Sequence, residues 1–126
     1  MGARLLAVAL GGALGAVLRY LAGLGAQRLW GEHFPWGTLL VNLTGCLLLG
    51  GLLAWSSERA ALPESVRLFG AVGVCGAFTT FSTFGHETVE LLRRDQLPLA
   101  LAYAGASVLL GLLAVLAGRA AVLAWP

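Results

Sequence analysis

Four long apolar stretches restrict this chain to a membrane fold. They cover residues 5–29, 36–56, 66–92 and 99–123, and each exceeds the roughly 20 residues that a helix needs to cross a bilayer. Hydrophobic residues make up 59% of the 126 residues and charged residues 11%, against about a quarter charged in soluble domains. The sequence therefore predicts one all-α transmembrane domain of four helices. The net charge of +2 indicates no nucleic-acid partner.

The third stretch contains a run of hydroxyl side chains where lipid-facing helix is expected. Threonine weakens a helix through its branched side chain, and serine and threonine compete for backbone hydrogen bonds. Gly73 and Gly76, just before, loosen the backbone. Non-helical backbone at this depth is tolerated only beside protein or a polar cavity. We therefore expect the third helix to be broken in mid-membrane and to mark a site. The four hydroxyl residues are Thr79, Thr80, Ser82 and Thr83.

Two other polar residues lie inside apolar stretches. Arg19 can snorkel or cap carbonyls of another helix, or it can contact an anion directly. Asn42 can bond between helices or donate to an ion in a pore, and Thr38, one turn earlier, shares its helical face. The sequence leaves these alternatives open.

The last two stretches add further candidates. Glu87 can line a polar vestibule or end a helix in solvent, and Glu90 is spaced to pair with Arg94 one turn later. Ser107 can bond back to its own helix or face a pore.

Small residues form two stripes at helical spacing. Gly11 and Gly15 make a G-x-x-x-G motif in the first stretch. Such faces let membrane helices approach closely, so we expect tight packing at both stripes. The stripe in the fourth stretch consists of Ala104, Ser107, Gly111, Ala114 and Gly118.

Arginine is distributed almost evenly between the two membrane sides. Orientation follows the excess of Lys and Arg in short loops, and here that excess is nearly absent. We expect either one weakly biased orientation or insertion in both orientations, which gives an antiparallel homodimer. The small size of the chain also favours a dimer, because little interior exists for its polar residues. The side of the termini carries Arg4, Arg59, Arg67 and Arg119, and the other side carries Arg28, Arg93 and Arg94.

Three motifs occur in order along the chain. Residues 12–20 read GALGAVLRY, residues 37–42 read GTLLVN with Gly45 beyond, and residues 76–84 read GAFTTFSTF. Together with the four stretches, they resemble the Fluc (CrcB-type) fluoride channel family. The resemblance implies a dual-topology homodimer with two antiparallel fluoride pores. It also implies passive fluoride export across a prokaryotic cell (inner) membrane, which relieves fluoride toxicity.

The resemblance extends to individual residues. Gly76 and Thr79 match a helix break whose carbonyls hold a structural sodium ion on the dimer axis. His86 departs from the family, where a small polar or apolar residue is expected. With Thr38 on the face of Asn42, the pore candidates are Thr38, Asn42, Phe81, Ser82, Thr83, Phe84 and Ser107. Accessory candidates are Arg19, Glu87 and Tyr103.

The residue chemistry is consistent with this function and with others. Phe81 and Phe84 are spaced to share a face, and the positive edges of their rings can approach a small anion; ordinary packing is the alternative. A proton-coupled small-molecule exporter of the small multidrug resistance type needs a deep carboxylate, and stretches one, two and four contain none. A non-transporting scaffold would explain the small faces but not the polar residues. No nucleophile–base pair or metal-ligand spacing indicates an enzyme.

Overall fold

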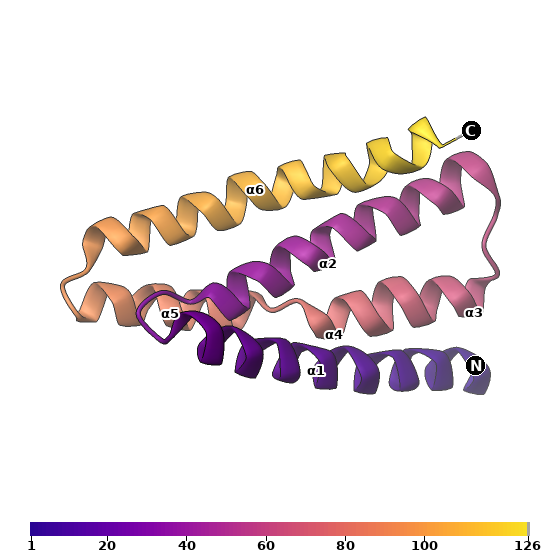
Figure 1. Cartoon of the computed structure of the whole chain (residues 1–126). Helices are drawn as coiled ribbons and strands as arrows, with labels where there is room; N and C mark the ends of the chain where they lie inside the picture. The colour runs from indigo at the N-terminus through magenta and orange to yellow at the C-terminus, as the bar shows by residue number, and fades with distance from the viewer. Residues whose placement is uncertain (126) are drawn as a thin grey trace.

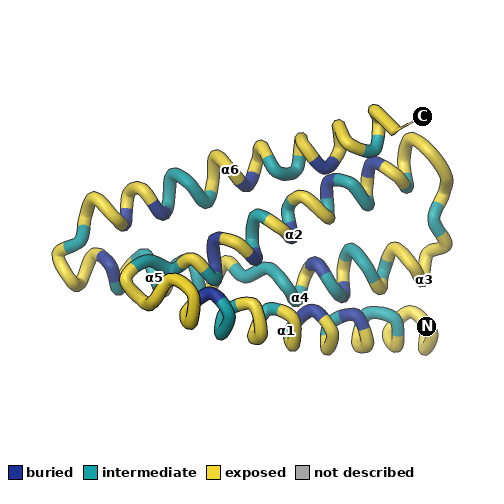
Figure 2. Tube along the Cα trace, in the orientation of Figure 1, coloured by how far each residue is buried: buried dark blue, intermediate teal, exposed yellow. Residues whose placement is uncertain are grey.

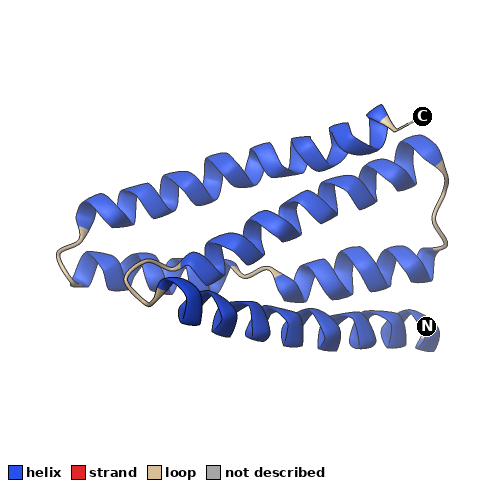
Figure 3. Cartoon of the chain, viewed as in Figure 1, coloured by secondary structure: helices blue, strands red, loops and turns tan. Residues whose placement is uncertain are grey.

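The chain folds into helices joined by short turns (Figure 3). The computed structural model describes residues 1–125, and no strand occurs in that range. Within it, four helical segments are long and apolar enough to cross a membrane, so the predicted all-α architecture with four candidate transmembrane helices is confirmed. These segments are Gly2–Trp30, Trp36–Arg59, Glu64–Arg93 and Leu97–Ala124.

The first and fourth segments are single helices, whereas the second and third are assembled from shorter elements. The second ends in a π-helical turn, and the third contains a longer π-helical part. In chain order the elements are α1 (Gly2–Trp30), α2 (Trp36–Ala54), η1 (Trp55–Arg59), α3 (Glu64–Arg67), η2 (Leu68–Cys75), α4 (Gly76–Phe78), α5 (Phe81–Arg93) and α6 (Leu97–Ala124).

Proline and positive-φ residues lie at the starts and ends of the helices. Pro35 and Pro63 stand directly before α2 and α3, and Pro98 lies in the first turn of α6. Proline is tolerated there because the first helical N–H groups have no partner within the helix. Gly31, at φ 74°, follows α1, and Asp95, at φ 56°, lies between α5 and α6. A glycine adopts such a φ without steric cost, which explains the end of α1.

The helices form two packed pairs (Figure 1). α2 packs mainly against α6, and α1 packs mainly against η2 and α4 of the third segment. The two chain ends lie at the same end of the molecule, and the α1–α2 loop and α5 lie at the other. The even number of spans brings the termini together.

Glycines form the close contacts between the packed helices. A side-chain carbon added to Gly11 or Gly15 would collide with backbone carbonyls of η2. One added to Gly118 of α6 would collide with the carbonyl of Leu47 in α2. These positions belong to the two predicted small-residue stripes. Close backbone approach gains van der Waals contact where lipid supplies no hydrophobic drive between helices.

Burial is low along every span. Between 11% and 33% of the residues in each apolar window are buried, and exposed positions occupy much of α1 and α6 (Figure 2). The exposed positions include many large apolar side chains, such as Leu101 at 64%. Apolar side chains that face outward on all spans fit a bilayer as the surrounding solvent.

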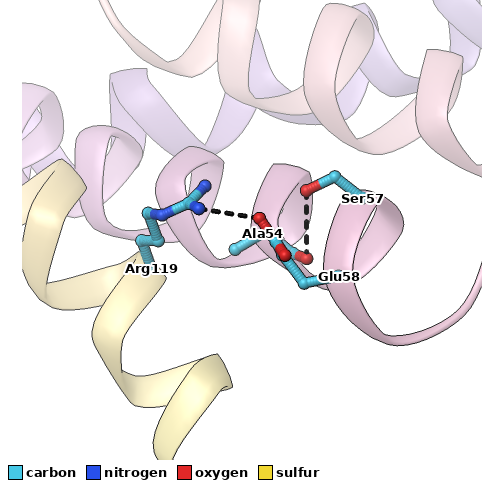
Figure 4. Close-up of polar contacts among 4 residues, drawn as sticks. All are labelled: Ala54, Ser57, Glu58 and Arg119. Atoms are coloured by element: carbon cyan, nitrogen blue, oxygen red, sulfur yellow. Dashed lines mark hydrogen bonds and ion pairs between the residues drawn. The ribbon is translucent and has the colours of Figure 1, made fainter.

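Ion pairs tie the elements together near the termini. Arg119 of α6 pairs with Glu58 of η1 at 2.7 Å (Figure 4). Arg4 of α1 pairs with Glu64 of α3 at 2.8 Å. Both ion pairs are solvent-exposed in the structure, and exposed ion pairs contribute little to the free energy of unfolding. Their main effect is therefore on how the helix ends near the termini are positioned.

Arg59 satisfies the last carbonyls of α6. Its guanidinium donates to the carbonyls of Val122 at 3.1 Å and Leu123 at 2.9 Å, and also to that of Trp125. The final carbonyls of a helix have no partner within it, so this arginine caps α6 from the end of η1.

At the opposite end, the predicted pair of Glu90 with Arg94 is wrong. Glu90 instead pairs with Arg93 at 3.1 Å. Arg94 is the C-cap of α5, and its N–H still donates to the Glu90 carbonyl at 3.1 Å. Residues three and four apart are both neighbours on a helix surface, so spacing alone does not select between Arg93 and Arg94.

The glycine contacts predict a strong difference between two neighbouring positions. Gly11→Ala should destabilise the protein by about 1–3 kcal/mol, because the added methyl group forces η2 away from α1. Gly12→Ala is the matched control, since a carbon added there meets no described atom within 4 Å. Thermal unfolding of both variants in detergent measures the difference. Equal midpoints would show that α1 and η2 are not in this close contact.

Candidate functional site

Two extended residues interrupt the third span. α4 ends at Phe78, and α5 begins at Phe81. Between them, Thr79 has φ −82° and ψ 158°, and Thr80 has φ −151° and ψ 117°. Branched threonine side chains favour such extended backbone. The backbone polar groups of these residues leave the helical ladder and need other partners.

Asn42 of α2 supplies partners for both backbone groups of Thr80. The Thr80 N–H donates to Asn42 Oδ1 at 2.8 Å, and Asn42 Nδ2 donates to the Thr80 carbonyl at 3.1 Å. The Asn42 carboxamide thus supplies the acceptor and the donor that neighbouring backbone groups would supply in a continuous helix. Of the two predicted roles for Asn42, the interhelical hydrogen bond is the one that the structure contains.

Side chains also cap both sides of the interruption. Thr80 Oγ1 accepts from the Thr83 N–H at 3.2 Å, which makes Thr80 the N-cap of α5. On the other side, Arg19 Nε donates to the Ala77 carbonyl at 3.1 Å. Arg19 therefore caps a carbonyl of another helix, as one of its two predicted roles requires, and its charge lies at the C-terminal end of α4.

The capping bonds deprive two carbonyls of their usual donors. In a continuous α-helix, the Thr80 N–H would donate to the carbonyl of Gly76. Likewise, the Thr83 N–H would donate to the carbonyl of Thr79. Both N–H groups are instead taken by the side chains of Asn42 and Thr80. The Gly76 carbonyl thus belongs to the end of a half-helix, where the dipole favours a cation, while Thr79 is extended and lies just outside it.

A cavity of about 320 Å³, the inner cavity, lies beside the interruption. Ser107 of α6 lines it, and its Oγ is buried with no hydrogen-bond partner among residues 1–125. The alternative in which Ser107 bonds back to its own helix is therefore wrong. A buried hydroxyl without a partner is costly, so Ser107 is available to a ligand. The lining of the cavity includes Asn42, Gly76, Thr79, Thr80, Phe81, Phe84 and Ser107.

Two phenylalanines of α5 flank the inner cavity. The ring centroids of Phe81 and Phe84 are 5.6 Å apart at an interplanar angle of 45°, so the two rings share a face. Phe84 also contacts Tyr103, with centroids 5.2 Å apart. Phe81 is 83% exposed, so most of its ring surface is uncovered within the single chain.

Glu87 lies at the centre of a second polar cluster. Thr38 Oγ1 donates to Glu87 Oε1 at 2.8 Å, and the Tyr103 hydroxyl donates to Glu87 Oε2 at 2.7 Å. Tyr103 is fully buried, at 0% exposure. Both carboxylate oxygens are therefore engaged across three helices, and Glu87 does not simply end a helix in solvent.

Two more cavities extend the inner one toward the end of the molecule. The central cavity, of about 240 Å³, is lined by Arg19, Thr80 and Thr83. The mouth cavity, of about 330 Å³, is lined by residues of the α1–α2 loop and of α5. Thr38 and Glu87 line both, and Thr80 lines the central and inner cavities. Three cavities in succession thus share lining residues.

The remaining candidates lie on the first turn of α5. Thr83 is half-buried and accepts from Thr80 Oγ1 at 2.9 Å. Ser82 is exposed, with its Oγ 3.4 Å from the same hydroxyl. Sequence reasoning missed the capping role of Thr80, although a threonine directly before a helix is a recognisable N-cap.

The residue types near the interruption determine which metal ions they could hold. In the part of the chain that the structure describes, no group of three His, Cys, Asp or Glu residues is placed to bind a metal. The oxygens available are the carbonyls of Gly76 and Thr79 and nearby hydroxyls. Such hard, uncharged donors suit a hard cation and not a soft transition metal.

Comparison with known proteins gives a consistent picture. Residues 6–119 match the family described as "CrcB-like protein, Camphor Resistance (CrcB)". Two similar curated proteins are fluoride-specific ion channel FluC 1 of Nitrobacter hamburgensis, 50% identical, and FluC of Nitrobacter winogradskyi, 48% identical. Each alignment covers 114 residues and 90% of both chains. FluC of Anaeromyxobacter dehalogenans is 50% identical over 107 residues, 85% of both chains.

The Asn42 contacts predict a specific loss of stability. Asn42→Ala leaves the N–H and carbonyl of Thr80 without partners, and unsatisfied groups of this kind cost about 1–3 kcal/mol. We expect a lower thermal unfolding midpoint in detergent. Thr44→Ala, at an exposed position of the same helix, is the matched control and should leave the midpoint unchanged. If both variants unfold alike, Asn42 does not hold the interruption.

Proposed function

The chain belongs to the CrcB-like family, and on this basis we propose that it is a fluoride-specific ion channel through which fluoride leaves the cell passively, relieving fluoride toxicity. It is a multi-pass protein of a prokaryotic cell membrane, as its four membrane-spanning helices and its bacterial relatives show. The alternative, a proton-coupled exporter of the small multidrug resistance type, is not favoured, because the similar curated proteins carry the name of a fluoride channel.

The unpartnered hydroxyl of Ser107 is the observation that best supports an anion path. It lines the inner cavity, and no residue from 1 to 125 accepts its hydrogen or donates to its oxygen. A hydroxyl is a donor that an anion accepts from directly. We assign Ser107 as a fluoride ligand in the pore, with the amide of Asn42 as a second polar group of the same lining.

Phe81 and Phe84 supply a weaker positive lining. The edge of an aromatic ring is positive and its face negative. Ring edges can therefore approach a small, hard anion without the strong trap that a full cation would create. Conduction requires sites strong enough to replace water and weak enough to release the ion. The two rings and the Ser107 hydroxyl together meet that requirement.

Hydroxyl groups extend the proposed path along the cavities. Ser82 and Thr83 can each donate to a passing anion, whereas Thr38, whose single hydrogen is donated to Glu87, lines the path beside them. Glu87 would repel fluoride if its carboxylate were free. Its two oxygens accept hydrogen bonds from Thr38 and Tyr103, and these bonds stabilise the carboxylate and hold it in place. We assign Arg19, Glu87 and Tyr103 as accessory groups that shape the path.

We infer an antiparallel homodimer from the residues of the inner cavity that remain exposed in a single chain. Phe81 is 83% exposed, and Gly76 is exposed as well, although both line the inner cavity. A second copy would cover them and close the path. The nearly even distribution of arginine between the two sides permits insertion in both orientations, so two copies can meet head to tail with a pore at each face.

The break in the third helix, which we place at mid-membrane depth, suits a structural sodium ion. The Gly76 and Thr79 carbonyls have lost their usual helical donors, and one chain supplies too few oxygens to enclose an ion. Two copies that meet at the break would supply both pairs. Bound sodium would neutralise the inward-pointing carbonyl dipoles and stabilise the dimer.

Flux measurements test the channel. Protein in liposomes should release fluoride down its gradient, with chloride release near the protein-free rate. Ser107→Ala should lower fluoride flux roughly tenfold or more, because a hydrogen bond to a charged group contributes about 1.5–3 kcal/mol. Phe81→Ile and Phe84→Ile should lower it too, since isoleucine has no ring quadrupole.

Ser65→Ala, at an exposed position of α3, is the matched control for the flux variants. Comparable release of fluoride and chloride by the unmodified protein would refute the channel. Undiminished flux in Ser107→Ala would remove Ser107 from the path while leaving the channel standing.

Sodium removal tests the cation site through dimer stability. Replacing sodium by potassium or by a bulky organic cation should lower the thermal midpoint and the dimer fraction in detergent, because a ligand that binds only the folded dimer stabilises it by an amount that grows with the ligand concentration. Chemical cross-linking followed by gel analysis measures the dimer fraction. Unchanged dimer and midpoint down to trace sodium would mean that hydroxyls and water satisfy the break.

A further inference from the structure

Aromatic rings in contact connect the mouth cavity to the inner cavity. Phe34 of the α1–α2 loop lines the mouth cavity, and Phe84 of α5 lines the inner cavity. Tyr103 of α6 lies between them, with its ring centroid 5.5 Å from that of Phe34 and 5.2 Å from that of Phe84. A loop residue at the entrance is thus linked to a ring of the inner cavity through one intervening side chain.

The backbone of Phe34 is fixed although its loop is exposed. Residues 31–33, directly before it, are exposed, whereas Phe34 is half-buried. The Trp36 N–H donates to the Phe34 carbonyl at 2.8 Å, and Pro35 between them has φ −77° and ψ 61°. These are the angles of an inverse γ-turn, and the proline ring holds φ near this value. A tight turn therefore joins Phe34 to the start of α2 and keeps its ring against Tyr103.

Tyr103 is the buried support of the Phe84 ring. The second aromatic neighbour of Phe84 is Phe81, which is 83% exposed and holds it only weakly within one chain. Tyr103, in contrast, is fully buried, and its hydroxyl donates to Glu87. The planes of the Tyr103 and Phe34 rings meet at 80°, and edge-to-face pairs of this kind add stability beyond the burial of their area. Phe34 therefore helps to fix the surface on which Phe84 rests.

We propose that Phe34 is a positioning residue for fluoride conduction: through Tyr103 it holds the Phe84 ring in place beside the inner cavity. The proposal rests on the fluoride channel function stated above. Phe34→Leu keeps an apolar side chain but removes the ring that Tyr103 contacts. Tyr103 then gains freedom to tilt, Phe84 follows it, and the anion meets a less ordered lining. An aromatic pair shifts an equilibrium roughly twofold to tenfold, and we expect fluoride flux to fall by a similar factor.

Tyrosine NMR tests the contact without any transport measurement. The chain contains two tyrosines, Tyr103 and Tyr20, and Tyr20 is 66% exposed on α1. In detergent-solubilised protein with isotope-labelled tyrosine, Phe34→Leu should shift the ring signals of Tyr103 and leave those of Tyr20 in place. Tyr20→Phe assigns the two sets of signals. Unshifted Tyr103 signals in Phe34→Leu would overturn the proposal whether or not the protein conducts fluoride.

Fluoride release from liposomes tests the consequence. Phe34→Leu should release fluoride roughly twofold to tenfold more slowly than the unmodified protein. Phe69→Leu, the same substitution on η2 outside the mouth, central and inner cavities, is the matched control and should release it at the normal rate. Size-exclusion profiles and thermal midpoints check folding, and Phe34→Met replaces Phe34→Leu if leucine prevents it. Normal release from the folded variant would overturn this proposal alone, whereas no release from the unmodified protein would refute the channel function.

A double-mutant cycle separates positioning from a merely structural role. In the Phe84→Ile background the ring to be positioned is gone, so adding Phe34→Leu should lower the residual flux no further. In the Tyr103→Phe background the ring remains and only the hydroxyl is lost, so Phe34→Leu should still lower flux. A further loss in the Phe84→Ile background would show that Phe34 acts elsewhere. An effect that vanishes in the Tyr103→Phe background would show that it acts through Glu87, and either result would overturn the proposal.

Discussion

One carboxamide on α2 holds the arrangement on which the candidate site depends. Asn42 binds both backbone groups of Thr80, so a non-helical gap persists in a span where lost backbone bonds are expensive. If Thr79 and Thr80 were helical, the chain would advance through them by about 1.5 Å and 100° per residue in place of two extended steps, so α5 would shift and turn relative to α4. Phe81 and Phe84 would then take different directions, and the carbonyl end of α4 would disappear. The gap therefore sets both the direction of the rings and the position of the half-helix end.

This polar arrangement depends in turn on very small residues. A side-chain carbon on Gly45 would collide with Thr79 Cγ2. Gly45 lies three residues after Asn42 on the same helical face. Because Gly45 has no side chain, α2 can approach Thr79 closely enough for the Asn42 carboxamide to reach Thr80. On α1, Gly15 likewise allows close approach to η2, and it lies four residues before Arg19, which donates to the Ala77 carbonyl. The stripes that pack the bundle also bring its few polar side chains into contact.

The sequence predicted the parts of the structure that follow from composition and local pattern. Four apolar stretches indicated four spans, and the hydroxyl run indicated where the polar residues gather. It did not reveal partners on other helices, because spacing along one helix does not define the register between two. Tyr103 and Thr38 meet at Glu87 only in three dimensions. Spacing also did not distinguish two arginines near Glu90, because positions three and four residues on are both its neighbours, and the carboxylate pairs with Arg93 and not with Arg94.

The distribution of charge along the cavities explains how such a path can be selective without trapping its ion. Arg19 and Glu87 are the two ionisable residues of the central cavity besides Tyr20, and each is already engaged, one with a helix-end carbonyl and the other with two hydroxyls. A full positive charge aimed into a dry cavity would bind a small anion too tightly to release it. Past these groups, the inner cavity is lined by a hydroxyl, an amide and two phenylalanine rings. In the proposed channel, weak donors beyond restrained charges would provide a sequence of shallow binding sites, and rapid passage of a strongly hydrated ion requires sites that are shallow.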